Sequence, residues 1–210
     1  MAERVGGHPV LVFVNTLYSW TEPDAPDELA SFAAALEVAV AAGIATRGEA
    51  RALAGDSRRE LERLRALRRL LHDVFAAHAP RPADLDALAE AWAAAARHAR
   101  LQATGRGRVE LGFPPDGPEV IRHRLIQSAI DLLRSPDRAR VGACPACGWL
   151  FLDTSKNRSR RWCSMKTCGS AAKAATYYRR RVAPVIRVGS PRGRSRARKG
   201  PSRRPPGARR

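Results

Sequence analysis

Apolar residues recur at three- and four-residue spacing along much of the first 135 residues, which predicts amphipathic helices. The strongest repeat runs from Ser57 to about His78. Its apolar face is expected to consist of Leu61, Leu64, Leu67, Leu71, Val74 and Phe75. The start of this repeat, with Ser57 followed three residues later by Glu60, predicts a capping box at the first turn.

Similar spacing predicts further helices on both sides of this one. The pattern Thr46-Arg-Gly-Glu49 predicts a second capping box. Proline and glycine residues indicate where the helices begin and end. We expect these helices over residues 27–42, 46–55, 82–105 and 118–134.

Two short segments have a different pattern. Pro9–Val14 is a continuous apolar run, which fits either a buried strand or a short helix, and periodicity does not separate the two. Val109–Phe113 predicts a short strand, closed by the turn Pro114–Gly117. Residues 1–135 are therefore expected to form a mainly α N-terminal domain.

The charge of the chain changes sharply near residue 140. The net charge is +18, and residues 1–140 hold 19 basic and 19 acidic residues, whereas residues 141–210 hold 19 basic residues and one acidic residue. The last 24 residues, 187–210, contain ten basic residues, four prolines, four glycines and no acid, which predicts a disordered basic tail. A neutral domain followed by a basic one is typical of a protein that binds a polyanion such as nucleic acid.

All four cysteines lie between Cys144 and Cys168. Cys144 and Cys147 are separated by two residues, and Cys163 and Cys168 by four, with fifteen residues between the pairs. The longest early apolar run has five residues and no leader surrounds it, so we expect a cytoplasmic chain without a membrane span, in which thiols stay reduced. This spacing favours one structural Zn²⁺ with four thiolate ligands over two disulfides.

The segment around the cysteines predicts a small α+β treble-clef-like zinc module over residues 138–182. Trp149–Ser155 has the composition of a strand, Lys156–Ser159 that of a turn, and Arg160–Trp162 that of a returning strand. A helix is expected from Cys168 to Arg181. Asp153 is expected to cap the turn or to orient a neighbouring arginine.

Residues 140–181 closely resemble the CGNR zinc finger, the C-terminal module of a bacterial family of proposed stress-induced transcription regulators. Its usual partner is an N-terminal domain called ABATE, and Asn15-Thr16 after an apolar run and Leu64–Arg68 in a central helix are similar to recurring features of that domain. The resemblance implies a DNA-binding transcription regulator. The family's Cys-Gly-Asn-Arg is replaced by Cys-Gly-Ser-Ala over residues 168–171, so an amide and a guanidinium that could contact phosphate are missing.

Basic side chains around the predicted metal site are the candidates for nucleic-acid binding. They are Arg158, Arg160, Arg161, Lys166, Lys173, Arg179, Arg180 and Arg181. A rigid zinc module that presents a short basic helix can lay it in the major groove of DNA. The alternatives are an RNA- or ribosome-associated protein and a protein-interaction module in which zinc is only structural.

The N-terminal domain shows no sequence motif of catalysis, so we do not expect an enzyme. Asn15, Arg65 and Arg68 are polar groups on apolar elements and could face a pocket for a small anionic effector. In the alternative interpretation, Asn15 caps backbone groups and the arginines pair with Glu62 or Asp73. If the pocket is real, the domain would be a sensor coupled to the zinc module. The N-terminal domain is thus expected to be a sensor or dimerisation domain, and the chain could form a homodimer.

Overall fold

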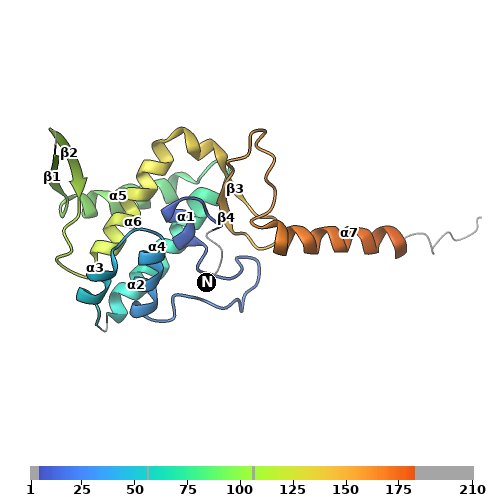
Figure 1. The fold of residues 1–210 in the computed structure, drawn as a ribbon, viewed down its shortest axis with the longest axis horizontal. Coiled ribbons are helices and arrows are strands. Elements are labelled where there is room, and N and C mark those ends of the chain that lie inside the picture. Colours follow the sequence, from blue (N-terminus) through green and yellow to red (C-terminus); the bar gives the residue numbers. More distant parts are fainter. Residues whose placement is uncertain (1–4, 56, 106, 183–210) are drawn as a thin grey trace, which may run out of the picture. The chain divides into compact units, whose positions relative to one another are not determined.

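The structure is a computed structural model that describes residues 5–55, 57–105 and 107–182. It divides into two compact units, one ending at Ala174 and the other beginning at Ala175. The first unit is mostly helical (Figure 1). The predicted basic tail, 187–210, lies outside the described residues.

Seven α-helices, four short strands and two irregular helical turns make up the described chain. The helices are α1 (Pro9–Val14), α2 (Phe32–Ala41), α3 (Arg47–Ala52), α4 (Arg58–Ala76), α5 (Pro82–Ala96), α6 (Val120–Arg134) and α7 (Ser170–Val182). The strands are β1 (Arg100–Gly105), β2 (Arg108–Gly112), β3 (Val141–Ala143) and β4 (Leu150–Leu152). A 3₁₀ turn, η1, covers Pro136–Arg140, and a π turn, η2, covers Met165–Gly169.

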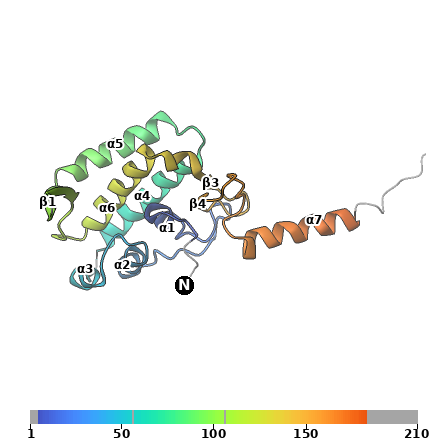
Figure 2. The ribbon, with the colours of Figure 1, turned by 45° about the horizontal axis from the view of Figure 1, so that its top comes forward.

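Helix α4 is the centre of the helical core and packs against α1, α2, α5 and α6 (Figures 1 and 2). All six side chains expected on its apolar face are buried, which confirms that face. Ser57, however, makes no capping bond at the start of the helix. Glu60 is buried instead, and it accepts a hydrogen bond of 2.7 Å from Arg122 of α6, so the predicted capping box at Ser57 is wrong.

The apolar run Pro9–Val14 is a helix, α1. It lies against α4, α6 and β4, and four of its six residues have no exposed surface: Val10, Leu11, Phe13 and Val14. A helix satisfies its backbone groups within the segment, as in the 3.0 Å bond from Val12 N to His8 O. This local pairing explains how a short run can be largely buried without its backbone pairing in a sheet.

Two element boundaries differ from the predictions by five residues or more. α2 begins five residues after Asp27, because the Asp27 carboxylate accepts the backbone N–H of Leu29 and Ser31 forms the N-cap. The helix predicted to reach residue 105 ends at Ala96, and Arg100–Gly105 pairs as β1 with β2. That prediction is wrong because the two glycines of the turn, Gly105 and Gly107, adopt φ values of 88° and 72° and let the chain fold back.

The capping box predicted at Thr46 is confirmed at the start of α3. The Thr46 hydroxyl accepts the backbone N–H of Glu49, and the Glu49 carboxylate accepts the backbone N–H of Thr46. The Arg124 guanidinium of α6 also donates to Glu49, and this hydrogen bond lowers the pKa of the Glu49 carboxyl to about 2. The first turn of α3 is thereby tied to α6.

The β-hairpin of the zinc module is formed by a different pair of strands from the pair expected. β4 pairs antiparallel with β3, with Val141 opposite Leu152, whereas residues 160–162 form no strand. Hydrogen bonds that involve side chains hold those residues instead. In one of them, the backbone N–H of Arg160 donates to Asp153 Oδ2 at 2.9 Å. Leu150 and Leu152 of β4 are buried in the same core as the helices. In the part of the chain that the structure describes, no helix is long and apolar enough to cross a bilayer.

Candidate metal centre and basic surface

The four cysteine sulfurs converge on one point. All lie within 4.8 Å of one another, and Cys163 Sγ is 3.6 Å from Cys147 Sγ and 3.5 Å from Cys168 Sγ. Four thiolates at Zn–S distances of about 2.3 Å around a tetrahedral ion are about 3.8 Å apart. The arrangement therefore fits one Zn²⁺ with no open coordination position. Such a site supports a fold and does not activate water.

The backbone around the first two cysteines forms a tight knuckle. Gly148 N donates to Cys144 O at 2.9 Å, and Cys144 N donates to Trp149 O at 2.8 Å. Gly148 has a φ of 74°, in the left-handed region that glycine adopts without strain. Cys168 lies in the π turn η2, directly before α7. These local features shape the backbone next to Cys144, Cys147 and Cys168.

The protonation of the thiols depends on what surrounds them. Burial raises the pKa of the Cys147 thiol to about 12 and also raises that of Cys163. Burial acts in the same direction at Cys144, but backbone hydrogen bonds outweigh it and lower the pKa of that thiol to about 7. A bound cation would stabilise all four thiolates together, which is the usual condition for a buried cysteine cluster to deprotonate.

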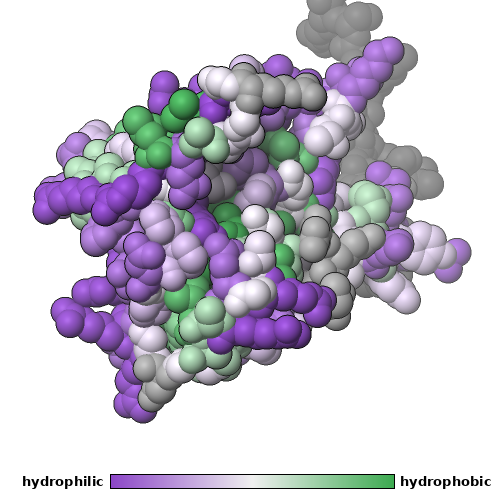
Figure 3. Space-filling view, turned by 60° about the vertical axis from the view of Figure 1, so that its left-hand side comes forward, coloured by the Kyte–Doolittle hydropathy of each residue, from purple (hydrophilic) through white to green (hydrophobic). Residues whose placement is uncertain are grey.

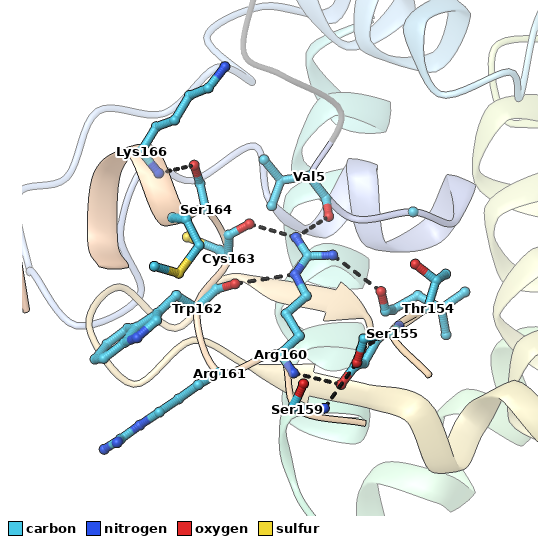
Figure 4. A pocket seen from close by; sticks show the side chains of 14 residues that line it. Val5, Thr154, Ser155, Ser159, Arg160, Arg161, Trp162, Cys163, Ser164 and Lys166 are labelled. Atoms are coloured by element: carbon cyan, nitrogen blue, oxygen red, sulfur yellow. Dashed lines mark hydrogen bonds between the residues drawn. The ribbon is translucent and has the colours of Figure 1, made fainter. Parts of the chain in front are cut away.

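Arg160 holds together the loop that carries Cys163 (Figure 4). Its guanidinium lies over the Phe151 ring at 4.5 Å. It donates to four backbone carbonyls, at Val5, Leu152, Trp162 and Cys163, over 2.6 to 3.2 Å. These four hydrogen bonds let Arg160 order the loop of the metal site although it is not itself a metal ligand.

Asp153 is the one acidic residue after residue 140, and it is buried. Its carboxylate accepts the backbone N–H of Ser155 at 2.8 Å and that of Arg160 at 2.9 Å. A hydrogen bond from the Ser155 side chain, aided by these two backbone N–H groups, lowers the pKa of the Asp153 carboxyl below its ordinary value. Asp153 thus both caps the turn and fixes the backbone of Arg160, as expected from the sequence.

A hollow of about 860 Å³ opens beside Arg160 (Figure 4). Hydroxyl groups of Thr154, Ser155, Ser159 and Ser164 line it. Arg161 and Lys166 also line it and are exposed, as is Arg158 in the neighbouring turn. Arg161 lies 5.2 Å from the centre of the Trp162 ring, which limits the positions that its guanidinium can take.

The remaining basic candidates are on α7. Lys173 is exposed, and so are the three arginines of the last turn, Arg179, Arg180 and Arg181. Ser170, at the position of the family's asparagine, donates its hydroxyl to the carbonyls of Lys166 and Thr167, both at 2.8 Å. It therefore joins α7 to the preceding π turn.

Asn15 makes contact with the zinc module. Its side-chain amide donates to Leu150 O and accepts from Leu150 N, both at 2.8 Å, and the residue is buried. Asn15 thus pairs with backbone groups, as in the alternative that the sequence allowed, but those groups belong to a strand 135 residues away.

The two arginines grouped with Asn15 make bonds within the chain. Arg68 is buried and donates to both carboxylate oxygens of Asp27 at 2.6 Å. Arg65 donates twice to the Leu29 carbonyl. The expected partners, Glu62 and Asp73, are therefore wrong for both arginines. Effector binding at Asn15, Arg65 and Arg68 stays a prediction.

One set of contacts around the knuckle was not expected from the sequence. Trp20 stacks on His72 with ring centres 3.8 Å apart, and Trp20 N donates to Cys147 O at 2.8 Å. His72 Nε2 lies 3.1 Å from Gly148 O, and Trp149 Nε1 donates to Leu17 O. No local pattern indicates these partners, because they are more than 50 residues apart in the chain.

Comparison with known families assigns most of the chain. Residues 140–181 match the CGNR zinc finger. Residues 7–136, more than half of the chain, match ABATE, described as "Putative stress-induced transcription regulator". No curated protein is similar enough in sequence to be matched. The chain therefore belongs to the ABATE family, and it carries a CGNR zinc finger whose four clustered cysteines indicate one Zn²⁺.

Proposed function

We propose that this protein is a transcription regulator that binds DNA through the exposed basic surface of its zinc finger. The proposal rests on the position of Asp153, the one acidic residue after residue 140. Residues 141–182 hold nine basic residues and Asp153, and Asp153 is buried with its carboxylate bonded to backbone N–H groups. The exposed charges of the finger are therefore all positive, as a phosphate backbone requires.

The exposed members of the predicted set have different roles from Arg160 in this proposal. Arg158, Arg161 and Lys166 lie on or next to the hollow with the hydroxyl lining, where guanidinium and hydroxyl groups can donate to phosphate oxygens. Arg160 contributes its charge but uses its N–H groups for carbonyls of the chain. It acts as a positioning residue.

Helix α7 is the element that supports a role in the major groove. Its first half is rich in alanine, and Lys173 and the three arginines 179–181 are exposed. A slim basic helix can approach base edges, although most of its charges would contact phosphates and so set position. Ser170 and Ala171 replace residues that the family uses here, so sequence preference would come from other side chains of this helix.

The test uses the full-length, zinc-loaded chain and a duplex selected from a random pool. We expect log K to fall linearly with log salt concentration, with a slope of about −0.9 for each phosphate contacted. Arg161→Gln should reduce this slope by about one unit, and Arg59→Gln, which removes an exposed arginine of α4, should leave it unchanged.

Two results would contradict the proposal. One is the absence of salt-dependent duplex binding by the zinc-loaded chain. The other is stronger competition by structured RNA than by unrelated duplex DNA, which would favour the RNA-associated alternative.

A further inference from the structure

The hairpin of β1 and β2 is a separate two-stranded ribbon at the far end of α5 (Figure 1). Ten of its eleven residues in the two strands are exposed. An isolated two-stranded ribbon is only marginally stable in water. A third strand on one of its edges would stabilise it, and in the described chain both edges are without one.

One face of the ribbon is apolar. Leu101 lies opposite Leu111, and Ala103 lies opposite Val109, so these four side chains share a face. The exposed fractions are 76% for Leu101, 60% for Val109 and 45% for Leu111. Figure 3 shows the side of the molecule on which the ribbon lies, where hydrophobic residues reach the surface between hydrophilic ones.

The other face of β2 carries two opposite charges, Arg108 and Glu110. Across the ribbon, Arg108 faces Gly105 and Glu110 faces Gln102, so neither lies directly opposite a counter-charge in β1. Within the residues that the structure describes, neither takes part in an ion pair. The two charges are therefore available to another strand at the outer edge of β2.

We propose that this edge pairs with β2 of a second copy of the chain, antiparallel and centred on Val109. A two-fold axis through Val109 places Arg108 opposite Glu110 of the partner subunit, and Glu110 opposite Arg108 of the partner subunit. Both pairs are attractive, and the two valines meet at the axis. The two ribbons then form a four-stranded sheet with a continuous apolar face.

The charges select this register. Centring the strands on Arg108 or on Glu110 would place a like charge directly opposite itself, which is destabilising. The edge of β1 offers no acidic residue to pair with its Arg100. Of these pairings, only that of two β2 edges centred on Val109 places each of the two charges opposite a charge of the other sign.

The contact is expected to be weak in the absence of DNA. A single pair of strands with two ion pairs buries less area than the roughly 1,200 Å² of a stable specific interface. Dissociation constants on the order of micromolar therefore fit this geometry better than nanomolar ones. Two chains held on one duplex would associate more readily, because the second contact becomes intramolecular.

The experiment is sedimentation of the full-length, zinc-loaded chain without nucleic acid, over a range of concentrations. We expect concentration-dependent dimers. Glu110→Arg and Arg108→Glu should each weaken association by about tenfold or more, because two attractive pairs become repulsive. The double variant Arg108→Glu/Glu110→Arg should restore it, since the pairs are re-formed with reversed sign.

The matched control reverses two exposed charges on α4, Arg59→Glu with Glu62→Arg, which also keeps the net charge and should leave association unchanged. A chain that stays monomeric at all concentrations overturns the proposal, as does a double variant that associates no better than the single ones. Because no DNA is present, neither result depends on the proposed nucleic-acid surface.

Discussion

Asn15 uses both polar ends of its side chain on the backbone of one distant residue, Leu150. The sequence places an amide after an apolar run, and the properties of asparagine predict a bond to backbone groups. Which backbone group it meets depends on how α1 and β4 pack together. Arg160 is similar: its charge is visible in the sequence, but its four carbonyl partners come together only in the folded loop.

For this single residue, we predict that Asn15→Ala lowers the free energy of unfolding by about 2–4 kcal/mol. The change leaves the N–H and the C=O of Leu150 buried without partners, at about 1–3 kcal/mol each. Urea unfolding followed by circular dichroism measures the loss. Asn157→Ala, at an exposed turn position, should change the free energy of unfolding by less than about 0.5 kcal/mol. Equal effects of the two variants would show that the buried pairing is not what stabilises this contact.

Helices α3 and α4 show how far an element can be predicted from its own residues. Both begin with the same pattern, a hydroxyl residue followed three positions later by glutamate. Only α3 forms the capping box, because the glutamate of α4, Glu60, is buried against α6 and pairs with Arg122. The apolar periodicity still predicted α4 correctly, since that signal depends on which face is buried and not on a terminal contact.

Thr46 and Ser57, the residues before α3 and α4, therefore provide a matched pair of variants. Thr46→Ala should lower the free energy of unfolding by about 1 kcal/mol, because the N–H of Glu49 loses its acceptor. Ser57→Ala should change it by less than about 0.5 kcal/mol, because the Ser57 side chain makes no capping bond. Chemical denaturation of the two variants measures the difference. A larger loss at Ser57 than at Thr46 would contradict the assignment of the caps.

In the whole molecule, the zinc finger and the helical core share buried residues. The domain boundaries expected from composition, 1–135, 138–182 and 187–210, stay predictions, and the structure groups the chain up to Ala174 into one compact unit. Leu150 and Leu152 lie in the helical core, and β4 carries them there directly after the cysteine knuckle. Metal binding is thus expected to stabilise the helices as well as the finger.

We predict that zinc removal lowers the unfolding temperature of the entire helical unit. A structural zinc site is linked to folding, and the loss of a few kcal/mol in a protein of this size corresponds to about 10 °C. Far-UV circular dichroism, which reports mainly on the helices, should show one transition that moves down on chelation and returns when zinc is added back. Cys163→Ser should have the same effect without a chelator. A helical transition that keeps its temperature after zinc loss would show that the two parts fold independently.

The sequence by itself determined the features that depend on neighbouring residues. The cysteine spacing predicted the metal site, apolar periodicity predicted most of the helices, and the distribution of charged residues located the basic region after residue 140. The tertiary structure decided which polar groups meet across the chain: Asn15 with Leu150, Arg68 with Asp27, and Arg160 with the carbonyls around Cys163. The physical reason is that burial on one face repeats locally along a helix, whereas a buried donor takes whichever acceptor the packing brings within reach.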